Sequence, residues 1–131
     1  MIWERHVDDD FRTALFAHSR CIVYPPIHDE PFGMVAVEAM AQGTPVLIPD
    51  RGGITEIIAA DGADGGLMFH SWDTASLAEQ LERLITDDAL HASLSAGSLK
   101  VARSFGIEAM TDRVLEHIGL PPHPPGSMTK T

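Results

Sequence analysis

The chain has 131 residues, 44% of them hydrophobic and 21% charged, and its nineteen acidic against nine basic residues give a formal net charge of −10. That length suits one domain with a hydrophobic core, and the acidic balance argues against nucleic acid or an anionic membrane surface as the main partner. No apolar run approaches the ~18–20 residues of a transmembrane segment, the N-terminus is unlike a signal peptide, and the single Cys21 excludes a disulfide framework, so we expect a cytoplasmic globular protein.

The first half of the chain alternates helical and strand patterns. Acidic residues 8–10 precede apolar residues at helical spacing, which predicts a helix over roughly 9–18; residues 1–6 could carry a strand remnant around Ile2 and Trp3. The apolar run 21–24 has the length and β-branching of a buried strand. The pattern then predicts a helix over 33–42 ended by Gly43, a strand at 46–48, a short helix over 54–60 and a third strand at 67–69.

The second half is helical. Asp73 is a good N-cap for one helix, and Asp87 or Asp88 caps a second that Gly106 ends. Apolar residues from 107 to 118 mark a last helix, and Gly119 ends it. We assign 1–118 to one domain and 119–131 to a proline-rich mobile tail. Strands alternating with helices predict an α/β fold, a partial Rossmann-like parallel sheet flanked by helices.

The loop 25–31 carries the candidate chemistry, because ligands of open α/β sheets bind beyond the carboxyl ends of the strands. Gly33 allows close approach to its backbone, and the amides of 33–35 are expected to be unpaired at a helix N-terminus, which attracts phosphate. Glu30 precedes this helix, and at ~1.5 Å per residue Glu38 lies roughly 7–8 Å along it from Gly33. Carboxylates at such places can accept hydrogen bonds from sugar hydroxyls, or they can simply serve the helix dipole and solubility.

The stretch from Glu30 to Glu38, E-P-F-G-M-V-A-V-E, is followed by E-A-M-A-Q-G-T-P-V and G-G-I-T-E-I-I. This contiguous pattern, from Pro25 to Ile58, resembles the two-glutamate motif of retaining GT-B glycosyltransferases, family 4, of the glycosyltransferase group 1 type; a looser likeness covers about residues 7–117. The resemblance implies part of the donor-binding C-terminal domain of an enzyme that transfers a hexosyl group from a nucleoside diphosphate sugar. It also implies that no cofactor and no metal are needed.

The resemblance assigns roles by position. Glu30 becomes the catalytic-site residue that contacts the donor sugar, Glu38 holds the ribose, and the backbone that meets the sugar and diphosphate belongs to Phe32, Gly33, Met34 and Val35. We add two donor-binding candidates from their place in the sequence. His28 lies in the loop that faces the proposed pocket, and Arg51 is the nearest basic residue; each could equally be a plain surface residue of its loop.

Several family features are missing from the chain. It has no acceptor domain, and the upstream Arg and Lys that neutralise the diphosphate in the family are absent, so we expect the isolated chain to be inactive. The strand at 21–24 would be an open edge where another strand should pair, which favours self-association or marginal stability. Two alternatives stay open: a non-catalytic truncated or degenerate subunit that packs on a partner chain, and a GT-B-fold sugar-nucleotide epimerase relative.

Overall fold

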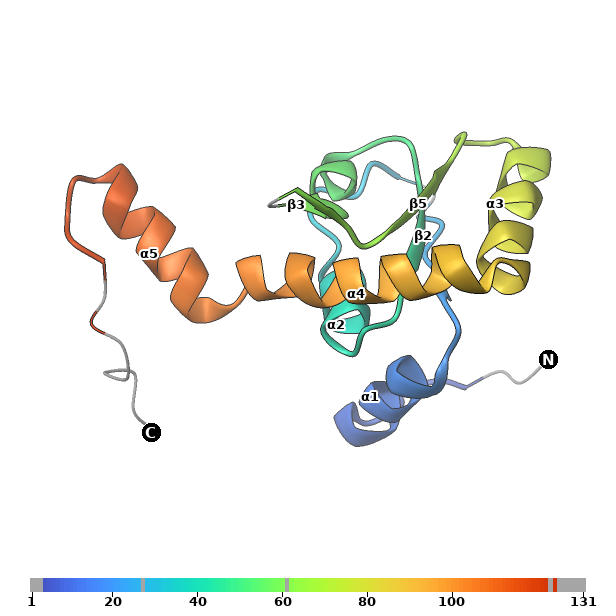
Figure 1. Ribbon diagram of the computed structural model, residues 1–131, viewed down its shortest axis with the longest axis horizontal. Helices are drawn as coiled ribbons and strands as arrows, with labels where there is room; N and C mark the ends of the chain where they lie inside the picture. Colours follow the sequence, from blue (N-terminus) through green and yellow to red (C-terminus); the bar gives the residue numbers. More distant parts are fainter. Residues whose placement is uncertain (1–3, 27, 61, 123, 125–131) are drawn as a thin grey trace.

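The computed structural model describes residues 4–26, 28–60, 62–122 and 124. The strand remnant expected around Ile2 and Trp3, and most of the tail 119–131, lie outside these residues. The elements, in chain order, are α1 (Asp9–His18), β1 (Ile22–Val23), α2 (Met34–Ala41), β2 (Val46–Pro49), the 3₁₀ helix η1 (Gly53–Glu56), β3 (Ala59–Ala60), β4 (Ala63–Asp64), β5 (Gly66–Phe69), α3 (Thr74–Thr86), α4 (Asp88–Ser104) and α5 (Ile107–His117) (Figure 1).

The main sheet has three parallel strands in the order β1-β2-β5. Ile22 pairs with Val46 at one side of β2, and the whole of β2 pairs with β5, from Val46 opposite Gly66 to Pro49 opposite Phe69. Every residue of β2 is buried, as expected for a central parallel strand covered on both faces. The expected α/β fold with a parallel sheet flanked by helices is therefore confirmed.

The short helix expected over 54–60 is only half correct. Helical backbone stops at Glu56, and Ala59 and Ala60 instead pair antiparallel with Asp64 and Ala63. Gly62 lies in the turn of this hairpin with a φ of +71°, a backbone conformation that glycine adopts without steric cost. The helical pattern of 54–60 is too short to form a stable helix by itself. The turn at Gly62 and the antiparallel pairing therefore determine the conformation of Ala59 and Ala60.

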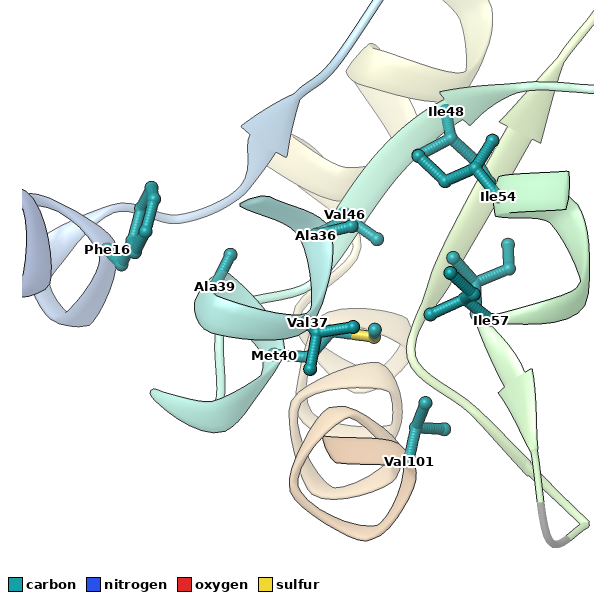
Figure 2. Close-up of a cluster of buried hydrophobic side chains, with 11 residues drawn as sticks. Phe16, Ala36, Val37, Ala39, Met40, Val46, Ile48, Ile54, Ile57 and Val101 are labelled. Carbon is teal, nitrogen blue, oxygen red and sulfur yellow. The ribbon is translucent and has the colours of Figure 1, made fainter. Parts of the chain in front are cut away.

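Two apolar clusters pack against the two faces of the sheet. Residues of α2, η1 and β2 meet in the larger cluster, where Val46 and Ile48 point to the α2 side (Figure 2). On the opposite face Leu47 and Phe69 contact Leu84 of α3 and Leu94 of α4. The long helix α4 contributes to both clusters, because Val101 belongs to the first one. These layers fix the carboxyl ends of the strands and the N-terminus of α2 relative to each other.

The two outer helices bury less than their apolar spacing suggests. In α1 the buried side chain is Phe16, whereas the apolar residues Phe11 and Leu15 are about half exposed. In Figure 1, α5 extends past the end of α4 and away from the sheet, and none of its residues is buried. Within the described ranges no helix is both long and apolar enough to cross a membrane.

Candidate active site

The N-terminus of α2 forms the centre of the candidate site. Gly33 is its N-cap, with a φ of +82°, and no side chain of its own is available to cap the helix. Glu30 lies just before the helix: its Oε1 accepts the N–H of Gly33 at 3.2 Å and that of Phe32 at 3.4 Å. One of the amides expected to face a phosphate thus donates to Glu30, while those of Met34 and Val35 lie in the first turn, where the helix itself provides no acceptor.

Glu30 is further held by side chains from the preceding strand and loop. Tyr24, directly after β1, donates its hydroxyl to Oε2 at 3.0 Å, and Nε2 of His28 lies 3.8 Å from the same oxygen. The tyrosine hydrogen bond is the main cause that lowers the pKa of Glu30, followed by the two backbone amides and the nearby histidine, while partial desolvation opposes them. The site therefore holds an ionised carboxylate that is only 17% exposed.

Glu38 lies further along α2 and is paired with the neighbouring helix. Its Oε2 is 3.1 Å from Nε of Arg12 in α1, and both side chains are a little more than one third exposed. Arg12 also contacts Asp9 at 3.2 Å. Of the two glutamates predicted from the sequence, Glu38 thus lies on α2 and Glu30 just before it. Each has a partner that sequence reasoning missed. Neither Tyr24 nor Arg12 carries a local signal, because both contacts arise only in the folded chain.

Gly52 and Gly53 support the loop that carries Glu30. The N–H of Ile54 donates to the carbonyl of Glu30 at 3.3 Å. A Cβ on Gly52 would come within 2.8 Å of that carbonyl oxygen, and one on Gly53 would overlap the carbonyl oxygen of Pro31. This glycine pair therefore allows two loops to pack backbone against backbone.

The remaining predicted residues differ in what they offer a ligand. The Phe32 ring packs edge-on against Phe105, with centroids 5.6 Å apart, and Val35 packs against the larger core cluster, so both can reach a ligand chiefly through their backbone. Met34 is 58% exposed. Arg51 pairs with Asp29 in the loop 25–31, with 3.3 Å between Nε and Oδ1. It therefore lies beside the loop of Glu30.

A cavity of about 290 Å³ opens at the carboxyl edge of the sheet, next to that loop. Pro25, Pro26, Arg51 and Trp72 are among its lining residues. The Arg51 guanidinium lies 5.1 Å from the centre of the Trp72 ring. Of the site residues predicted from the sequence, Arg51 lies in the wall of this cavity, whereas Glu30, Glu38 and the first turn of α2 are not among the lining residues.

Acidic residues near α1 serve the helix. Asp8 is its N-cap and accepts the N–H of Phe11 at 2.7 Å, and Asp9 and Asp10 fill the first turn. Across the part of the chain that the structure describes, no three His, Cys, Asp or Glu side chains come together in a way that could hold a metal ion.

A parallel α/β sheet flanked by helices is the architecture that the resemblance to GT-B glycosyltransferases implies. The family described as Glycosyl transferases group 1 matches residues 2–101, so the chain belongs to that family. It is 38% identical over 103 residues to a D-inositol 3-phosphate glycosyltransferase of Nocardioides sp., covering 79% of this chain and 22% of that protein. The corresponding protein of Corynebacterium aurimucosum is 40% identical over 97 residues, covering 74% and 22%.

Solved structures show the same fold. Sucrose-phosphate synthase from Thermosynechococcus elongatus superposes with a TM-score of 0.71 at 27% identity, over 86% of this chain and 28% of the synthase. Anabaena HepE, solved in complex with UDP and glucose, gives a TM-score of 0.64 at 25% identity, over 79% and 28%. The chain therefore spans between one fifth and one third of the length of these relatives.

Proposed function

We propose that the chain is the nucleotide-sugar donor-binding part of a retaining glycosyltransferase, one that transfers a hexosyl group from a nucleoside diphosphate sugar. The observation that carries this proposal is the first turn of α2, which has Glu30 just before it and Glu38 just after it. The complex of HepE with UDP and glucose supports the same ligand class for a protein of this fold.

Each part of the ligand has a matching group. The amides of Met34 and Val35, at the positive end of the helix dipole, would meet the diphosphate and stabilise its charge as it leaves. Glu38 has Oε2 on Arg12 and would accept ribose hydroxyls through its other oxygen. Glu30 would accept a hydroxyl of the transferred sugar. Bound diphosphate can also recruit the Gly33 amide if Glu30 releases it.

Charge limits what these residues can do alone. The chain has a net charge of −10, and both glutamates repel a diphosphate over a short distance. Arg51, which lies beside the loop of Glu30, and His28, which lies in it, offset only part of this repulsion. Since the chain spans about a fifth of the length of the inositol phosphate relatives, we expect the 131-residue polypeptide to bind donors weakly and to transfer no sugar.

Calorimetric titration tests the proposal. UDP, UDP-glucose, GDP and GDP-mannose are titrated into the wild-type chain and into the Glu38→Ala variant. We expect saturable binding of at least one nucleotide and a loss of about tenfold in Glu38→Ala, equivalent to ~1.4 kcal/mol, because a hydrogen-bonding carboxylate is removed. Glu116→Ala, at an exposed acidic position of α5, removes the same charge as a control and should leave binding unchanged. Absence of binding, or equal affinities of wild type and Glu38→Ala, would contradict the proposal.

A further inference from the structure

Tyr24 is held at both ends. Its backbone N–H donates to the carbonyl of Leu47 in β2 at 2.9 Å, which continues the parallel pairing one residue beyond β1. Its ring packs against the larger core cluster. The hydroxyl therefore has a position fixed by the sheet and the core, unlike a side chain that stands on a free loop. This fixed hydroxyl ends 3.0 Å from Oε2 of Glu30.

We propose that Tyr24 is the positioning residue for Glu30, setting the plane in which its carboxylate meets the transferred sugar. This inference rests on the proposed function and adds to it a residue that no motif of the sequence marks. The carboxylate ends the flexible side chain of a loop residue. Three donors define its orientation: the amides of Phe32 and Gly33 on Oε1, and the phenol of Tyr24 on Oε2.

The arrangement leaves room for a ligand. A carboxylate can accept about four hydrogen bonds, and these three contacts leave acceptor capacity on Oε2. A sugar hydroxyl that approaches this oxygen finds it already oriented, so less rotamer entropy is lost on binding than with an unrestrained glutamate. A tyrosine hydroxyl suits this role because it is neutral: it orients the carboxylate without cancelling the charge that attracts the hydroxyl.

The ionisation of Glu30 gives a readout that is independent of binding. The phenol is the largest of the influences that lower the pKa of Glu30, so its removal should raise that pKa toward its ordinary value. The other charged groups facing this loop are His28 at 3.8 Å from Oε2 and the Asp29–Arg51 pair beside it. All three stay unchanged in a Tyr24→Phe variant, which keeps the ring and its packing.

The experiment compares UDP with UDP-glucose in the full chain. We expect wild type to bind UDP-glucose more tightly than UDP. In Tyr24→Phe the affinity for UDP-glucose should decrease about three- to tenfold, while the affinity for UDP stays within twofold of wild type. Carboxyl NMR should show a higher pKa for Glu30 in Tyr24→Phe. Ser95→Ala is the control, since it also removes one hydroxyl hydrogen bond, to the carbonyl of Gly43 at the other end of α2, and should change neither quantity.

The outcomes separate the two proposals. If wild type binds UDP-glucose more tightly than UDP and Tyr24→Phe keeps the full gain, the positioning role is wrong while donor binding stands. Equal loss of UDP and UDP-glucose affinity in Tyr24→Phe would show a merely structural tyrosine, and an unchanged pKa of Glu30 would also overturn the inference. If wild type binds none of the nucleotides tested, the proposed function fails and the positioning role fails with it; if it binds UDP and UDP-glucose equally, only the positioning role fails.

Discussion

At the scale of single residues, Asp50 joins the loops that follow β2 and β5. Its Oδ2 lies 2.9 Å from Nδ1 of His70, and its Oδ1 accepts the N–H and the hydroxyl of Ser71 at 2.9 and 2.8 Å. The hydrogen bond between the carboxylate and the imidazole is the main cause that lowers the pKa of Asp50 and raises that of His70. The carboxyl edge of the sheet thus contains a pH-dependent connection close to the candidate site.

The sign of the expected pH dependence follows from these shifts. His70 has a higher pKa in the folded than in the unfolded chain, so its stabilising effect is complete below about pH 6.5 and is lost as the pH rises through its folded pKa. The effect of Asp50 is present above its unfolded pKa and is lost as the pH falls through its lowered folded value. We expect the thermal midpoint of wild type to decrease as the pH is raised above about 6.5, and that of the His70→Asn variant to decrease less. Equal pH slopes in the two proteins would contradict this prediction.

The sequence predicted which elements carry the two glutamates better than it predicted the contacts of their side chains. The pattern around Gly33 correctly predicted that Glu30 precedes one helix and that Glu38 lies on it, beyond its first turn. Their partners Tyr24 and Arg12 were not predictable, because β1 and α1 reach α2 only through tertiary packing, and periodicity describes one element at a time. Their roles toward a ligand stay predictions.

At the scale of elements, Gly53 links η1 to the site loop, and its substitution should disturb both. A Cβ there would overlap the Pro31 carbonyl oxygen, so Gly53→Ala must displace backbone; we expect it to lower the free energy of unfolding by about 3 kcal/mol, the upper part of the range for overpacking. Gly106→Ala, at the exposed N-cap of α5, should cost no more than about 1 kcal/mol. Urea unfolding measures both, and similar costs would show that the close approach of the two loops is unimportant.

The hairpin of β3 and β4 shows where local pattern fails at this scale. Each strand has two residues, which is too short for an alternation of apolar and polar residues to be recognised. Pairing across the turn at Gly62 and contact with α4 decide its conformation. The long helices α3 and α4, by contrast, begin after the predicted caps Asp73 and Asp87, whose side chains accept first-turn amides.

At the scale of the whole molecule, two apolar surfaces remain open. Within the described ranges β1 pairs with β2 alone, and Val23 of this edge strand is 36% exposed. The apolar residues Ile107 and Val114 of α5, and Ile118 at its C-cap, are each more than half exposed. An edge strand with free backbone groups and a helix with an uncovered apolar stripe both favour contact with another chain.

We therefore expect the chain to self-associate. Its net charge of −10 opposes this contact, and salt screens the repulsion, so association should increase with protein concentration and between low salt and ~0.5 M NaCl. Sedimentation velocity measures both dependences. A stable monomer at every concentration and salt level would show that the open edge and the α5 stripe do not recruit a second copy.

The central claim, that the first turn of α2 receives the diphosphate of a nucleotide, is tested most directly by amide NMR during titration with UDP. The account predicts saturable shifts of the Met34 and Val35 amides, and a shift of Gly33 as its bond to Glu30 is exchanged. The amides of Ala75 and Ser76 lie in the first turn of α3 and donate to Asp73, so their chemical shifts should not change. Equal shifts at both helix starts, or none at Met34 and Val35 when UDP is saturating, would contradict it.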